Sequence, residues 1–264
     1  MSTPLAPAPL DVMAWLRDAL HEYRFDLAGL LRDRAAPPTG WPLSVASEAE
    51  LVRTLRESGA LLPLPAESAA LANLLEVSLV AYLLRRLQAV PGATGQGGTV
   101  RSYPDLEIGG PAFGGGYHAI DIKAARRNKS RRATQSRITL YTANTYFKHP
   151  TRRFPGMRRA FGSYTTHVDV LAIFNFDPMS HAHVRDLRLL VHEPWRIGSR
   201  QRSSTTRNYI GAVTSLADLI AGRGEFDSAQ AFYDYWRAYD FKATAARPAR
   251  SGTDTGDGQL DLDL

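Results

Sequence analysis

The sequence predicts an α/β fold in which helices flank a central β-sheet. Apolar residues recur at helical spacing up to about residue 93, alternate as in strands between residues 102 and 198, and return to helical spacing between residues 212 and 241. A chain of 264 residues with 44% hydrophobic residues can bury a large core. We therefore expect a single domain over residues 1–241.

The expected helices can be placed from their caps and their apolar period. Residues 10–33 have apolar side chains at helical spacing, and Asp11 is positioned to cap the start of that helix. Residues 47–60 begin with a Ser/Glu capping box and end near Gly59. The longest helical pattern, of at most about seven turns, covers residues 65–90. Two further helices are expected over residues 212–224 and 227–241.

The strand-like segments follow a loop that we expect over residues 91–98, "PGATGQGG". They are rich in β-branched and aromatic residues and are separated by turn residues. The five expected strands cover residues 102–110, 117–124, 137–146, 165–178 and 186–198.

The end of the chain differs from the part before it. Residues 242–264 are rich in Ala, Arg, Gly and Asp and have no period that could pack, so we expect a disordered acidic tail. The domain before the tail divides into a helical part, about 1–93, and a part that carries the strands, about 94–241.

Composition excludes several classes of protein. The chain has no cysteine, so disulfides, thiolate metal sites and thiol nucleophiles are excluded. We find no basic segment followed by an apolar run, as in a signal peptide, and no apolar stretch long enough to span a membrane. These features predict a cytoplasmic protein without a membrane partner.

The formal net charge of +6 is unevenly distributed. Acidic residues gather near the ends of the chain, and basic residues gather in residues 123–137 and 148–159. Such segments can be solvated loops, or they can form a surface that binds the phosphates of a nucleic acid. We favour the second interpretation, because the first basic segment begins at Lys123, beside an unusual carboxylate.

That carboxylate lies in the strand-like segment "YHAIDIK", residues 117–123. A period of two places Asp121 and Lys123 on one face of the strand, although both are poor strand residues. Asp105 follows a proline at the start of the preceding strand, and the Gly-rich turn 109–116 between them is typical of a hairpin. The hairpin would bring the two carboxylates together, where a divalent cation such as Mg²⁺ would remove their repulsion.

The pattern Pro-Asp, a gap, then Asp-Xaa-Lys resembles the site of the PD-(D/E)xK nucleases. A solvent-facing ion pair of Asp121 and Lys123 on an edge strand would also explain these residues. Three longer blocks resemble the EcoRV-type type II restriction endonucleases: "SYPDLEI…YHAIDIKAARRNK…ITLYTANTY", "WRIGSRQRSSTTRNYIGAV" and "DLIAGRGEFDSAQAFYDYWRAYDF". The resemblance covers about residues 102–241, whereas the N-terminal part matches poorly.

The resemblance implies a restriction-endonuclease-like fold with a central mixed β-sheet. It also implies a Mg²⁺-dependent homodimer in the bacterial cytoplasm that cuts both strands of a short palindromic site in double-stranded DNA and leaves 5′-phosphates. A cognate DNA methyltransferase would act in the same cell. By matching position, Asp105 and Asp121 would be metal ligands and Lys123 the catalytic lysine. Glu76, on the long helix, would be a further active-site carboxylate and metal ligand, or else a surface glutamate.

The resemblance also indicates which residues would contact DNA. The loop that enters the major groove in this family matches residues 203–209, after a strand that contains Trp195. Its candidate contacts are Ser203, Ser204, Thr205, Thr206, Arg207 and Asn208, of which Arg suits guanine and Asn suits adenine. Gln96 and Arg101, in the turn 95–102, match the loop that enters the minor groove. An ordinary polar surface loop is the alternative interpretation of both segments.

Two other function classes remain open from sequence. One is a DNA nuclease of the same fold outside restriction, such as a repair nuclease or a junction resolvase. The other is a catalytically inactive DNA-binding protein, although Asp105, Asp121 and Lys123 are all present. His181 and His183 stand two residues apart, but no third metal ligand is apparent beside them, so we expect a surface loop there.

Overall fold

The computed structural model describes residues 8–25, 47, 49–50, 53, 68–99, 102–142, 146–177 and 183–241. The expected helix over residues 47–60 lies almost wholly outside the described residues. The expected tail, residues 242–264, also lies outside them, as do Arg101 and His181.

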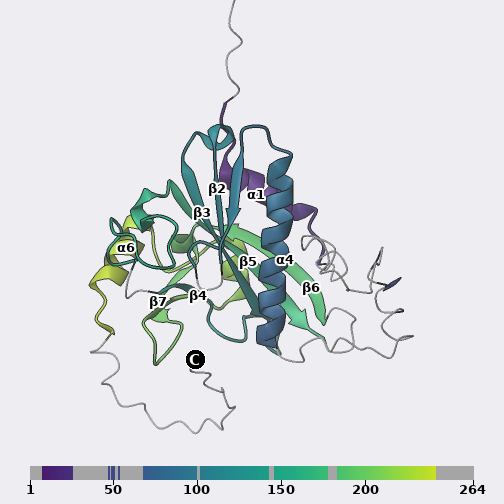
Figure 1. The fold of residues 1–264 in the computed structure, drawn as a ribbon. Coiled ribbons are helices and arrows are strands. Elements are labelled where there is room, and N and C mark those ends of the chain that lie inside the picture. The colour runs from purple at the N-terminus through teal and green to yellow at the C-terminus, as the bar shows by residue number, and fades with distance from the viewer. Residues whose placement is uncertain are drawn as a thin grey trace, which may run out of the picture.

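Helices α1 and α4 precede the strands among the described residues. Helix α1 spans Val12–His21, and the side chain of Asp11 caps it by accepting a hydrogen bond from the Ala14 amide at 2.7 Å. Helix α4 spans Ser68–Gln88 and packs on β3 and β1 of the main sheet (Figure 1). In the described part of the chain, no helix combines the length and the apolar character needed to cross a membrane.

The main sheet has five strands in the order β1-β2-β3-β5-β6 (Figure 1). Its strands are β1 Thr94–Gly97, β2 Leu106–Gly109, β3 Tyr117–Arg126, β5 Thr166–Phe176 and β6 Val184–His192. Strands β3 and β5 are parallel and the other neighbours are antiparallel, so the sheet is mixed, as expected. Strand β1 corrects the expected loop over residues 91–98. It has no apolar alternation, and it is a strand because it pairs with β2.

A second, antiparallel sheet has the order β4-β8-β7, with β4 Thr139–Thr142, β7 Gly198–Arg202 and β8 Tyr209–Ala212. The expected strand over residues 186–198 is interrupted, because β6 ends at His192 and Trp195 lies in the 3₁₀ turn Pro194–Arg196. Helices α5, Leu216–Ala221, and α6, Ala229–Ala238, follow as expected. Helix α6 lies across the molecule from α4 (Figure 1).

The two faces of the main sheet carry different cores. Ile120, Ile122 and Val170 belong to the cluster that contains α1 and α4 residues. Ala119 and Leu171, one position out of phase, belong to an aromatic cluster on the other face. That cluster includes Tyr141, Phe147, Phe161, Phe232 and Trp236. The period of two therefore directs residues 121, 123 and 169 to the aromatic face.

Candidate active site

The candidate site lies where β2 and β3 part. Pairing between β2 and β3 ends at Leu106 and Ile120, whereas β3 continues beside β5 as far as Arg126. Beyond Ile120, the amides of Ile122 and Ala124 on the β2 side of β3 therefore have no strand to pair with among the described residues. Instead, the Ile122 amide donates to Asp105 Oδ2 at 2.6 Å and the Ala124 amide donates to Glu76 Oε1 at 3.4 Å. Two carboxylates from distant segments thus converge on the part of β3 that extends beyond β2.

Asp121 and Lys123 share a face of β3, as the period of two predicts. Lys123 Nζ lies 2.7 Å from Asp121 Oδ2. Because β3 is a central strand and Asp121 is only 6% exposed, the alternative of a solvent-facing pair on an edge strand is wrong. A buried carboxylate needs a cation or several hydrogen-bond donors, and Lys123 meets part of that need.

The site holds more carboxyl groups than one lysine can keep ionised. Burial raises the pKa of Asp105 to about 8, and repulsion from Asp121 adds to this shift. Burial also raises the pKa of Glu76, although the nearby charge of Lys123 opposes it. Burial disfavours the Lys123 ammonium, but Asp121 and Asp105 outweigh it and raise its pKa. Lys123 is therefore a cation at neutral pH and acts as a positive charge rather than as a base.

The donors at this edge fit a magnesium ion better than a softer metal. Asp105 and Asp121 offer oxygen ligands, and Mg²⁺ commonly takes one or two carboxylates while it keeps waters and phosphate oxygens. Within the described residues, no three His, Cys, Asp or Glu side chains are placed to hold one metal ion together. Two carboxylates with open positions suit a cation that also binds a substrate phosphate.

Asp169 is a fourth carboxylate that the sequence interpretation missed. It is the Cα partner of Asp121 in the β3–β5 pair, and its side chain is 0% exposed. Burial raises its pKa well above the ordinary value, and Asp121 adds to that shift. The available signal was an acidic residue in the middle of the apolar strand "HVDVLAIF".

His167, also on β5, lies beside this cluster. Its ring stacks on Phe161 at a centroid distance of 3.9 Å. Its Nδ1 lies 2.5 Å from the Tyr103 hydroxyl and its Nε2 lies 3.1 Å from the Phe161 carbonyl oxygen. The neutral ring, with its proton on Nε2, satisfies both contacts. Burial lowers the pKa of His167 from 6.5 to about 4.

We therefore expect His167 to make the protein acid-sensitive. Between pH 6.5 and pH 4 the unfolded chain binds a proton at His167 and the folded chain does not. Protonation therefore favours the unfolded chain, and the free energy of unfolding decreases as the pH falls from 6.5 to 4. The loss is about 2 kcal/mol, allowing for partial exposure. Urea unfolding across this range should show a weaker pH dependence for His167→Phe than for the wild type. An equal dependence in both would contradict the assignment.

The candidate DNA-contacting residues 203–208 form the tip of the β7–β8 hairpin. The Ser204 hydroxyl accepts hydrogen bonds from the amides of Thr206 and Arg207 at 3.3 and 3.1 Å. Arg202 donates to the carbonyl oxygens of Thr205 and Arg207 at 3.0 and 2.8 Å. The tip is thus an ordered turn in which Thr205, Thr206 and Arg207 are exposed.

The remaining candidate contact, Gln96, is exposed on β1 and therefore lies on a strand rather than in a turn.

The two basic segments, residues 123–137 and 148–159, differ in what their side chains contact. Residues 126–129 and Arg131 line a hollow of about 210 Å³ at the ends of β3 and β5. In the second segment, Arg159 binds Glu107 and Arg158 donates to the Gly97 carbonyl oxygen at 2.6 Å, so these side chains serve the fold.

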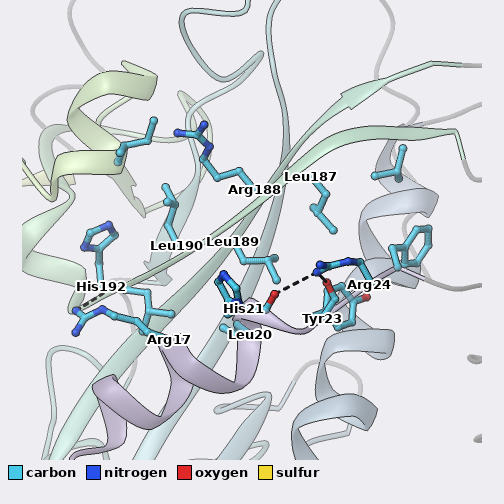
Figure 2. A pocket seen from close by; sticks show the side chains of 14 residues that line it. Arg17, Leu20, His21, Tyr23, Arg24, Leu187, Arg188, Leu189, Leu190 and His192 are labelled. Carbon is cyan, nitrogen blue, oxygen red and sulfur yellow. Dashed lines mark hydrogen bonds between the residues drawn. The ribbon is translucent and has the colours of Figure 1, made fainter.

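A cavity of about 730 Å³ lies elsewhere, between α1 and β6 (Figure 2). Arg17, Arg24 and Arg188 line it together with leucines, and none of the described residues that line it is acidic. Arg17 donates to the Val191 carbonyl oxygen at 3.4 Å and Arg24 donates to that of Tyr23 at 2.8 Å. The carboxylates of the candidate site do not reach this cavity.

Comparison with known proteins identifies the family. The model of the family "Restriction endonuclease EcoRV" matches residues 40–254. The chain belongs to this family. The Type II restriction enzyme EcoRV of Escherichia coli is 24% identical over an alignment of 156 residues, which covers 52% of this chain and 61% of that enzyme. The mixed sheet flanked by helices is the restriction-endonuclease-like fold, which confirms the expected fold class.

Proposed function

We propose that this member of the EcoRV family is a type II restriction endonuclease. It hydrolyses both strands of a short palindromic site in double-stranded DNA, requires Mg²⁺ and leaves 5′-phosphates. The observation that carries the proposal is the position of Asp105, Asp121 and Lys123 at the fork of β2 and β3. The catalytic domain would cover residues 1–241.

Each residue has a distinct task in the proposed reaction. Asp105 and Asp121 would hold Mg²⁺, which supplies charge neutralisation at the scissile phosphate and lowers the pKa of a bound water. The Ile122 amide orients Asp105 by its hydrogen bond. The Lys123 ammonium stabilises the negative charge that develops on the phosphate oxygens during in-line attack. The 3′ oxygen leaves, so the phosphate remains on the 5′ end.

Glu76 would be a further active-site carboxylate and would serve a second metal position. Its oxygen lies within reach of the Ala124 amide, one residue beyond Lys123. A surface glutamate would not bridge α4 and β3 in this way. The contact therefore favours the active-site role for Glu76.

The wider biological assignment follows from the proposed reaction. A palindromic target is read by a two-fold symmetric protein, so the enzyme would act as a homodimer. Cleavage of a specific site would endanger the host chromosome, so a cognate DNA methyltransferase would protect it. Both would act in the bacterial cytoplasm.

Specificity should depend on the β7–β8 tip. The exposed Arg207 guanidinium can contact guanine in the major groove, and each good contact of this kind contributes about 1–3 kcal/mol of discrimination. Arg207→Ala should therefore slow cleavage at the specific site by about 10- to 200-fold while binding to unrelated DNA changes little. Arg223→Ala, an exposed arginine that pairs with Asp218, is the control. Equal cleavage by both variants would remove Arg207 from the recognition surface.

The proposed activity can be tested with purified protein and phage λ or plasmid DNA. Incubation with Mg²⁺ should give discrete fragments on a gel, and EDTA should prevent them. A smear would instead indicate a nonspecific nuclease of the same fold. Intact DNA across several substrates and metal ions, combined with measurable binding, would indicate an inactive DNA-binding protein.

A further inference from the structure

Asp169 has no established task, and its surroundings are unusual. Its side chain is fully buried, and neither carboxylate oxygen has a hydrogen-bond partner among the described residues. Burying a carboxyl group without partners is costly, so such groups are ordinarily paired or placed at a functional centre. Asp169 therefore needs an explanation.

Glu107 offers a direct comparison within the same sheet. It is a buried carboxylate on β2, 6% exposed. Arg159 donates to both of its oxygens, at 2.9 and 3.1 Å, and the Tyr164 hydroxyl donates at 3.1 Å. Glu107 is thus a fully satisfied structural carboxylate. Asp169 has nothing equivalent, although it lies in a more deeply buried position.

The register explains what Asp169 could face. Asp121 and Asp169 are Cα partners in a parallel pair, so their side chains project from the same face about 5 Å apart. Lys123 lies two residues along the same face and already binds Asp121 Oδ2. One lysine thus stands among the carboxylates of Asp105, Asp121 and Asp169. One lysine cannot keep three neighbouring carboxyl groups ionised, so the arrangement favours a divalent cation.

We propose that Asp169 is a positioning residue of the cation site, which strengthens binding of a divalent cation at Asp105 and Asp121. It would act through the negative charge that it takes on when a cation binds, since no described donor compensates that charge. The proposal rests on the metal-dependent function proposed above. Outer residues of this kind typically change metal affinity by about 10- to 100-fold.

The test uses the full chain without nucleic acid and Mn²⁺ as the probe, with free Mn²⁺ measured by electron paramagnetic resonance. Asp169→Asn keeps the shape but not the charge, so it should weaken Mn²⁺ binding by about 10- to 100-fold. Its amide can donate to Asp121, so the metal-free melting temperature should not fall. Glu107→Gln is the matched control. It should melt at a lower temperature and bind Mn²⁺ within about twofold of the wild type.

Several outcomes would overturn the proposal. If Asp169→Asn binds Mn²⁺ as tightly as the wild type, or if it loses stability as Glu107→Gln does, Asp169 is a structural residue. Asp169→Ser serves as a second neutral variant, and a failure of both variants to fold would likewise show a structural role. If the wild type itself binds no Mn²⁺, the proposed metal dependence fails together with this inference. Unchanged binding in Asp169→Asn alone would leave the proposed function standing.

Discussion

Replacing Asp121 by asparagine is expected to slow DNA cleavage by at least about 1000-fold, which corresponds to about 4 kcal/mol of lost transition-state stabilisation. Asp121 would hold Mg²⁺, and its Oδ2 lies 2.7 Å from Lys123 Nζ, so the change affects two parts of the proposed site. Cleavage is measured as the rate of plasmid linearisation with Mg²⁺.

Binding to DNA should survive the same substitution, because Asp121 is buried and the proposed major-groove contacts lie at the β7–β8 tip of the second sheet. Fluorescence anisotropy with a labelled duplex measures this binding. Asp218→Asn, at a partly exposed position on α5, is the control and should cut at the wild-type rate. An Asp121→Asn variant that still cuts at a comparable rate would mean that the site is assigned to the wrong residues.

The largest expected effect on stability is at Phe232. Its side chain is fully buried on α6, and its ring lies 5.2 Å from that of Phe226 and 6.2 Å from that of Phe147. A Cβ atom added at Gly198 would lie 2.6 Å from the Phe232 ring, so α6 packs tightly on the start of β7. Phe232→Ala should therefore lower the free energy of unfolding by about 3–5 kcal/mol.

Urea denaturation followed by far-ultraviolet circular dichroism measures the effect of Phe232→Ala. Val77→Ala, at a position on α4 that is 44% exposed, is the control and should change the free energy of unfolding by no more than about 0.5 kcal/mol. If Phe232→Ala costs less than about 1 kcal/mol, α6 does not anchor the second sheet. Such a result would contradict the packing described for this face.

The parts of the site that depend on local pattern could be predicted from sequence. The period of two placed Asp121 and Lys123 on one face, and the Gly-rich turn between β2 and β3 predicted a hairpin that the structure confirms. Both features depend on short stretches of chain, so the residues themselves contain the information. The catalytic roles of Asp105, Asp121 and Lys123 stay predictions until cleavage is measured.

Features that depend on distant partners could not be predicted in the same way. The helical period left the face of Glu76 undecided, because its contact with Ala124 depends on how α4 docks on β3. The alignment of Asp169 with Asp121 depends on the parallel pairing of β3 with β5, which are separated by about 40 residues. Strand β1 exists because of its pairing with β2, not because of its own composition.

The two basic segments use their positive charges differently, and phosphate binding by the first stays a prediction. Arg127 and its neighbours line an open hollow, as a phosphate-binding surface would require. Arg159, by contrast, is bound to buried Glu107, and its guanidinium lies 3.3 Å from the centre of the Tyr117 ring. A count of positive residues cannot distinguish these uses, because the partner carboxylate lies about 50 residues away in the chain.

The most direct test of site-specific cleavage is to sequence the ends of the DNA fragments produced with Mg²⁺. We expect every end to derive from one short palindromic sequence, with the two strands cut at symmetric positions. Each 5′ end should carry a phosphate, so that the fragments can be ligated without further treatment. Ends scattered over unrelated sequences would contradict site-specific cleavage. Ends with 3′-phosphates would contradict the proposed direction of attack.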